Sequence, residues 1–223
     1  KGWSMKSITK QKSLEEIEQQ LDGMERVYII GCGTCATMTK TGGREEVLDM
    51  KERLQGLGKM LTGWTVIPTA CDEMTEVSLR ENNGAIQSAD CLLVMSCALG
   101  VQRVGSYIGK PVIPALDTLF LGVEDGPGNF HEVCDQCGQC VLGYTAGICP
   151  ITACHKGLLN GPCGGTNNGK CEIDKELDCG WTLIYQRLKE QDRLDLMKKY
   201  QPPRNSQVIP RPRMTRITGG GEK

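Results

Sequence analysis

Short apolar runs alternate with amphipathic stretches through the first half of the chain. The apolar runs are rich in β-branched residues, as buried strands are, and they cover residues 26–31, 64–68, 91–96 and 111–115. Between them, apolar residues recur at helical spacing over residues 44–57, 75–88 and about 99–109. Strands that alternate with helices predict a parallel sheet covered by helices on its faces. We therefore expect an α/β domain of Rossmann-like architecture over residues 26–116. A short amphipathic helix over 13–24 precedes it, because Ser13 and Glu16 have the spacing of a capping box.

A second region with a different pattern begins near residue 131. Residues 116–130, rich in glycine and acidic side chains, predict a linker. Residues 131–200 contain eight cysteines, many glycines and few bulky apolar residues before an amphipathic helix expected from Trp181 to about Lys199. Such a segment buries too little apolar surface to fold alone, so we expect metal–thiolate bonds to stabilise it. The proline-rich residues 201–223 predict an extended tail, either laid across a partner or solvated.

The cysteines of the first region follow predicted strands. Cys32 and Cys35 come after the first strand, Cys71 after the second and Cys97 after the third. The carboxyl ends of parallel strands share one edge, where open α/β folds bind ligands, so these four residues predict a metal site. Two alternatives remain: cysteines that reach strand ends only as buried residues, and a redox-active pair of Cys32 and Cys35. Cys91, at the start of its strand, is interpreted as a small buried hydrophobe.

The cysteine-rich segment opens with two overlapping C-x2-C steps, formed by Cys134, Cys137 and Cys140. A Cys149-Pro150 pair follows, and this order is typical of the way ferredoxins wrap a cubane cluster. The match is partial, because eight residues separate Cys140 from Cys149 where a bacterial ferredoxin has three. The remaining metal-ligand candidates are Cys154, Cys163, Cys171 and Cys179. Our working hypothesis joins the triplet to one late cysteine and leaves the other four for a second site.

Four thiolates can hold either zinc or a [4Fe-4S] cluster. The overlapping steps, the Cys-Pro pair and the abundant glycine amides favour clusters, whereas Cys163-Gly164-Gly165 and Cys171 are also compatible with zinc-knuckle turns. His131 and His155 lie among the cysteines, as ligands or as polar neighbours. Thirteen cysteines allow three four-ligand sites and one spare thiol. We expect two or three [4Fe-4S] clusters, with zinc possible at one site.

Composition narrows the function classes. The formal net charge of −1, from 26 basic and 27 acidic residues, argues against nucleic acid or an anionic membrane as the main partner. No apolar run reaches the roughly 18 residues of a membrane span, and no signal-peptide pattern is visible, so we expect a cytoplasmic protein with reduced thiols. Neither a Ser/His/Asp set, nor H-E-x-x-H, nor a Walker loop is present, and Gly31-Cys32-Gly33 is a weak dinucleotide fingerprint. Metal centres without another catalytic set are typical of electron-transfer proteins.

Several long motifs point to a known family. The residues ICPITACHKGLLNGPCGG, with the later GKCE and DCGWTLIYQRL, closely resemble the methylenetetrahydrofolate reductase C-terminal domain. The upstream IIGCGTCAT, followed by a Gly-Gly pair, resembles the N-terminal part of the same small proteins. Together, residues 25–200 resemble the iron–sulfur small subunit of the two-subunit methylenetetrahydrofolate reductases of acetogenic bacteria.

The resemblance implies a place in one-carbon metabolism, in the methyl branch of the Wood–Ljungdahl pathway. It implies a partner, a flavin-containing catalytic subunit whose barrel binds the folate, and an electron-donor protein or module that supplies this chain. The chain itself would then be a non-catalytic electron-transfer subunit. The alternative is a zinc-binding structural or interaction module of the same type of complex.

Overall fold

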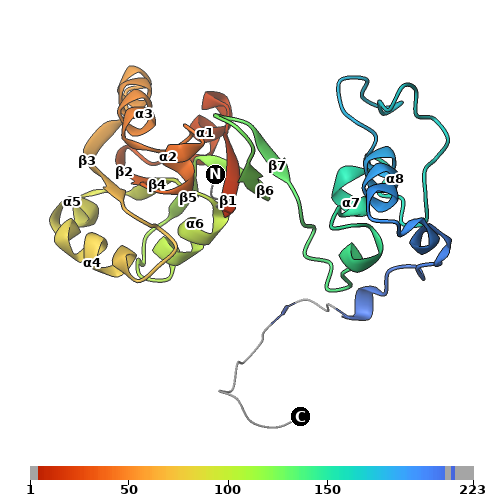
Figure 1. The fold of residues 1–223 in the computed structure, drawn as a ribbon. Helices are drawn as coiled ribbons and strands as arrows, with labels where there is room; N and C mark the ends of the chain where they lie inside the picture. Colours follow the sequence, from red (N-terminus) through yellow and green to blue (C-terminus); the bar gives the residue numbers. More distant parts are fainter. Residues whose placement is uncertain (1–4, 209–211, 214–223) are drawn as a thin grey trace, which may run out of the picture. The chain divides into compact units, whose positions relative to one another are not determined.

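The computed structural model describes residues 5–208 and 212–213, and the chain divides into two compact units. The first unit is Lys1–His131 and the second is Glu132–Lys223 (Figure 1). Among the helices of these described residues, none combines the length and the apolar composition that crossing a bilayer requires.

The first unit is built on a four-stranded parallel sheet, as the alternation of apolar runs and helices predicts. Its strands are β2 (Arg26–Cys32), β3 (Met60–Ile67), β4 (Cys91–Met95) and β5 (Val112–Pro114), in the order β3-β2-β4-β5. Cys32 at the end of β2 pairs with Ile67 at the end of β3, and Gly31 pairs with Met95 at the end of β4. The carboxyl ends of these three strands therefore lie together at one edge of the sheet.

Helices cover both faces of this sheet (Figure 1). The helices of the first unit are α1 (Leu14–Gln20), α2 (Cys35–Met38), α3 (Arg44–Gly56), α4 (Met74–Glu81), α5 (Asn83–Ser88) and α6 (Ala98–Gly105). Val27 and Ile29 of β2 face one apolar cluster with residues of α1 and α3, while Tyr28 and Ile30 face a second cluster with residues of α4, α5 and α6. Because both faces are buried, the central strands are continuously apolar rather than alternating.

A second sheet, which the sequence pattern does not predict, lies in the first unit except for Glu132, the last residue of its last strand. It is antiparallel, in the order β1-β6-β7, with strands β1 (Met5–Gln11), β6 (Leu116–Glu124) and β7 (Phe130–Glu132). The expectation of a linker over 116–130 is therefore wrong for β6 and for the first residue of β7. The hydrophobic pattern does not reveal this sheet because β1 buries polar side chains. Lys6 of β1 is almost fully buried. Its Nζ lies 3.1 Å from Oε2 of Glu124 and 5.9 Å from the ring centroid of Phe130.

The second unit has little regular structure. Its elements are η1 (Leu142–Tyr144), α7 (Pro150–Ala153), α8 (Gly180–Glu190), η2 (Leu194–Lys198) and η3 (Ser206–Val208). Of the residues predicted for the apolar face of α8, Trp181, Ile184 and Leu188 are buried and form a small core with Leu196, whereas the prediction is wrong for Tyr185, which is exposed. The helix ends at Glu190 instead of Lys199, because the chain turns through the positive φ of Asp192 into η2. Of the predicted tail 201–223, residues 209–211 and 214–223 lie outside the described part of the chain.

Candidate metal centres

The four cysteines of the first unit all lie beyond the carboxyl ends of parallel strands. Cys32 ends β2, Cys35 begins α2, Cys71 follows β3, and Cys97 is the N-cap of α6 after β4. From β2 the chain passes to β3 on one side, and from β3 it crosses back to β4 on the other side of β2. The carboxyl edge at β2 and β4 is therefore a topological switch point, where open α/β sheets bind ligands. We call Cys32, Cys35, Cys71 and Cys97 the sheet-edge set.

The thiols of the sheet-edge set are electrostatic neighbours. Burial raises the pKa of the Cys71 thiol, and the nearby sulfurs of Cys97, Cys32 and Cys35 raise this pKa further. The loop after β2 is held against the end of β3, because Gly33 N–H donates to the Ile67 carbonyl at 2.8 Å. A Cβ at Gly33 would lie 3.0 Å from the carbonyl oxygen of Pro68, so glycine permits this close approach. Backbone packing thus brings cysteines from three strand ends to one edge.

Cys91 is a buried residue of the apolar core, as the sequence predicts. It is fully buried in the apolar cluster on the α1 and α3 face, at the start of β4 and away from the sheet-edge set. Burial raises its pKa to about 11. A thiol in this state is a small hydrophobic side chain, and the prediction made for Cys91 is confirmed.

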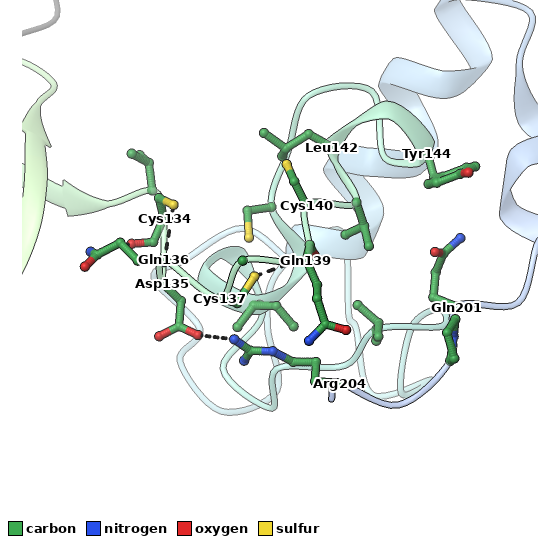
Figure 2. Close-up of a pocket in the computed structure, with 17 residues that line it drawn as sticks. Cys134, Asp135, Gln136, Cys137, Gln139, Cys140, Leu142, Tyr144, Gln201 and Arg204 are labelled. Atoms are coloured by element: carbon green, nitrogen blue, oxygen red, sulfur yellow. Dashed lines mark hydrogen bonds and ion pairs between the residues drawn. The ribbon is translucent and has the colours of Figure 1, made fainter. Parts of the chain in front are cut away.

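The second unit places four of its eight cysteines around one cavity of about 480 Å³ (Figure 2). These cysteines, which we call the first cavity set, are Cys134, Cys137, Cys140 and Cys149. Apolar side chains such as Leu142, Tyr144 and Ile151 complete much of the wall. Cys149 is thus the later cysteine that lines the same cavity as the triplet, and the four-cysteine metal site stays a prediction.

Local backbone conformation turns the triplet toward the cavity. Gln136 and Gly138 have φ values of 51° and 72°, in the left-handed region, so the chain curls tightly between the cysteines. The Gln136 N–H donates to Sγ of Cys134 at 3.4 Å. Hydrogen bonds from backbone amides to sulfur stabilise metal-bound thiolates and adjust the potential of iron–sulfur clusters. Cys149 is the N-cap of α7, and Pro150 occupies the first helical position, where its missing N–H costs nothing.

The other four cysteines line a separate, much smaller cavity of about 20 Å³. This second cavity set consists of Cys154, Cys163, Cys171 and Cys179. Its charged neighbours are Lys156 and Glu172, which form an ion pair. Glu172 Oε1 also accepts a hydrogen bond from Sγ of Cys163 at 3.5 Å, while the Gly165 N–H donates to the same sulfur at 3.4 Å.

Cys179 lies at the N-terminus of α8, the longest helix of this unit. Burial alone would raise its pKa, but hydrogen bonds from the side chain and backbone of Thr182 and from the backbone N–H of Trp181 outweigh burial and lower the pKa. A thiol at a helix N-terminus is stabilised as thiolate by the free amides there. These hydrogen bonds therefore favour the thiolate form of Cys179 relative to an ordinary cysteine.

The donor chemistry of the three sets fits a metal. Each consists of four thiols, the complement that holds either a [4Fe-4S] cluster or a structural zinc ion. Over residues 5–208 and 212–213, however, no group of three or more His, Cys, Asp or Glu side chains is already gathered closely enough to hold a metal ion. His131 and His155 are both exposed, and neither lines either cavity.

Sequence reasoning missed the charged and polar residues that surround the cysteines. Arg204 lines the first cavity and pairs with Asp135, 69 positions earlier in the chain. Lys156 and Glu172 likewise line the second cavity and form an ion pair with each other. No local pattern could have found these residues, because each pairing depends on how the irregular chain closes on itself.

Comparisons with known proteins relate part of the chain to one family. Residues 113–207 match a family model described as "Methylene-tetrahydrofolate reductase C terminal". Neither the curated proteins nor the solved structures gave a match. The matched segment contains all eight cysteines of the two cavity sets, whereas the sheet-edge set precedes it. The match covers less than half of the chain and includes the end of the first unit, so it shows a similarity of residues 113–207 to this family model.

Proposed function

We propose that this chain is an iron–sulfur electron-transfer subunit that relays electrons to the flavin of a methylenetetrahydrofolate reductase catalytic subunit. The observation that carries the proposal is the division of the eight cysteines into two sets of four, each lining its own cavity. The similarity of residues 113–207 to the reductase family model supports the choice of methylenetetrahydrofolate reductase as the enzyme of the complex. The electron donor would be a separate protein or module.

The two cavities differ in the size of group that they favour. A space of about 10–15 Å³ holds one water molecule, so the cavity of about 20 Å³ suits a single ion and favours zinc at the second cavity set. The cavity of about 480 Å³ favours a polynuclear cluster at the first cavity set. With a second cluster at the sheet-edge set, the chain would carry two [4Fe-4S] clusters and one zinc ion.

The residues of the first cavity would bind the cluster and control its surroundings. The four cysteines would hold it as thiolates, and the apolar side chains of Leu142, Tyr144 and Ile151 would contact it from the wall. The Gln136 amide already donates to the Cys134 sulfur. A [4Fe-4S] cluster supplies one-electron transfer, with a potential that depends on hydrogen bonds to sulfur and on solvent exposure. Cys134 and Cys140 are exposed, which leaves one side of the set open to a partner.

A second candidate function is a zinc-stabilised interaction module of the same type of complex. The small second cavity and the amide-to-sulfur bond at Cys163 favour it. In that case zinc would occupy the first cavity set as well, and the chain would carry no electrons. Metal identity at the first cavity set separates the two candidates.

Metal and sulfide analysis of the anaerobically purified chain tests the proposal. We expect about eight irons and one zinc per chain, with broad absorbance near 400 nm, if two cubanes form. Cys137→Ser and Cys71→Ala should each remove about four irons and spare zinc, whereas Cys163→Ser should remove zinc and spare iron. Colourless protein with only zinc would select the interaction module. An unaffected Cys71→Ala variant with thiol–disulfide turnover would instead select a redox pair of Cys32 and Cys35.

Electron relay is tested with the catalytic subunit present. The reduced chain should reduce the partner's flavin in anaerobic rapid mixing, and Cys137→Ser should abolish this reaction while the two subunits still co-purify. Flavin reduction by Cys137→Ser at the wild-type rate would exclude the first cavity set from the electron path.

A further inference from the structure

A short segment late in the chain contributes to the wall of the first cavity. Residues 201–205, which we call the strap, have the sequence QPPRN and no helix or strand. Gln201, Pro202 and Arg204 line the same cavity as the four cysteines (Figure 2). The strap therefore forms part of the wall around the first cavity set, although more than 50 positions separate it from Cys149.

Two side-chain amides hold the ends of the strap. The amide of Asn160 donates to the Gln201 carbonyl at 2.9 Å and accepts from the Gln201 N–H at 2.7 Å. The amide of Gln139 makes the same pair of bonds with Asn205, at 3.0 Å and 3.3 Å. Each side chain thus satisfies both backbone groups of one strap residue, as a neighbouring β-strand would.

The middle of the strap is stiff and carries a charge. Pro202 and Pro203 fix φ, so ordering this segment costs less conformational entropy. Nη2 of Arg204 donates to Oδ2 of Asp135 at 2.6 Å, which holds the guanidinium next to the C-x2-C step from Cys134 to Cys137 (Figure 2). The bond to Asp135 and, after it, the nearby sulfur of Cys137 raise the pKa of Arg204.

We propose that the strap is a fixed cover over part of the first cavity and that Arg204, held by Asp135, is a positioning residue that places a positive charge at the wall of the first cavity set. A cover that lines the cavity keeps bulk water and thiol reagents from Cys137 and Cys149, the two half-buried cysteines of the set, whereas Cys134 and Cys140 are exposed beside it. A cation beside four thiolates offsets their mutual repulsion, and this effect is strongest in a poorly solvated site. The role of Arg204 toward a bound cluster rests on the proposed function, whereas the cover depends only on the contacts of the strap.

The cover is tested by thiol labelling of the full chain as purified, under anaerobic conditions. Iodoacetamide is the probe, and peptide mapping gives the rate at each cysteine. Asn160→Ala removes two hydrogen bonds without changing a residue that lines the cavity. Labelling of Cys137 and Cys149, the half-buried cysteines of the first cavity set, should then be faster by about fivefold or more, at a net 0.5–1.5 kcal/mol per bond, whereas the exposed Cys134 and Cys140 should change less.

The second cavity set is the internal control, and its labelling rate should not change. The matched control variant is Asn167→Ala, at an exposed asparagine of the same unit, and it should label like the wild type. Wild-type rates at the first cavity set in Asn160→Ala would overturn the cover. An equal acceleration at both sets would also overturn it, because such a change indicates general loosening of the unit.

Arg204 is tested by the rate of iron loss to a ferrous chelator. Arg204→Gln should release the first-cavity iron about two- to fivefold faster, as expected for a partly exposed charge, while zinc loss stays unchanged. Arg204→Lys, which keeps the charge, should restore most of the difference. Equal rates in Arg204→Gln and wild type, or equal rates in the two variants, would overturn the role of Arg204. A wild-type chain without iron would overturn that role together with the proposed function, whereas the labelling result would still decide the cover.

Discussion

The two units of the chain contrast in what stabilises them. The first unit has an apolar cluster on each face of its parallel sheet, and its central strands β2 and β4 are almost completely buried. In the second unit, Trp181, Ile184, Leu188 and Leu196 are the buried members of its apolar cluster, and much of the backbone is irregular. Burial of apolar side chains accounts for the stability of the first unit. The second unit has the smaller apolar cluster, and we propose that metal–thiolate bonds at its two cavities supply the rest of its stability.

The largest predicted effect follows from removing metal. Metal binding to cysteine-rich modules contributes on the order of 10 kcal/mol to folding, more than most single side chains do. Chelator treatment should therefore abolish hydrogen-exchange protection of α8 in the second unit, while β2 and β4 of the first unit keep theirs. Unchanged protection of α8 in a chain shown to be free of metal would mean that its small apolar core is sufficient.

An intermediate effect is expected from a methyl group added inside the first unit. A Cβ at Gly42 would lie 2.1 Å from the backbone oxygen of Met95, at the end of β4. Gly42→Ala should lower the free energy of unfolding of the first unit by about 1–3 kcal/mol, toward the upper end because a backbone atom cannot move aside easily. Chemical denaturation followed by circular dichroism measures this change.

Gly56→Ala is the matched control for this experiment. Gly56 is the last residue of α3 and has no neighbouring atom within 4 Å of the added Cβ. Alanine is the better helix former, so the substitution should be neutral or stabilising by up to about 1 kcal/mol. Similar losses of stability in both variants would show that the contact at Met95 does not decide the result. The cysteine labelling of the second unit should remain as in the wild type for both variants.

The smallest predicted effect is the pH dependence from one ion pair of the first unit. Asp90 accepts hydrogen bonds from the side chain and backbone of Arg26 and from the Glu25 N–H, which lower its pKa to about 2. The folded pKa lies below the unfolded value near 4, so the contribution is fully present above about pH 4 and is lost as the pH falls toward about 2.

The Asp90→Asn variant isolates this contribution. At neutral pH it should be slightly less stable than the wild type, and the difference should disappear below about pH 2. The measurement is urea denaturation of both proteins across this range. A stability difference that is independent of pH would show that shape rather than charge at Asp90 is responsible.

The sequence predicts the first unit better than the second because periodicity reports burial. The runs at 26–31 and 91–96 are apolar on both faces and become the central strands β2 and β4. Hydrophobic periodicity does not reveal a strand that buries polar side chains. Strand β1 buries Lys6, Ser7 and Thr9, so its composition does not identify it as part of a sheet. Its partner β6 was mistaken for a linker for a related reason, because pairing across more than 100 positions leaves no local pattern.

The site is only partly encoded in local spacing. The C-x2-C steps at Cys134, Cys137 and Cys140 suffice to group the triplet, because left-handed turns at Gln136 and Gly138 complete each step locally. The strap and the partition of the later cysteines depend on long-range closure of an irregular chain. These features become visible only when the structure brings distant residues together.

The measurement that tests the central claim most directly is anomalous X-ray scattering from the anaerobically purified protein, recorded at the iron and zinc absorption edges. The account predicts an iron signal bounded by the first cavity set, a second iron signal at the sheet-edge set, and a zinc signal bounded by the second cavity set. Sulfurs of these sets without any metal signal between them, or joined to one another as disulfides, would contradict it.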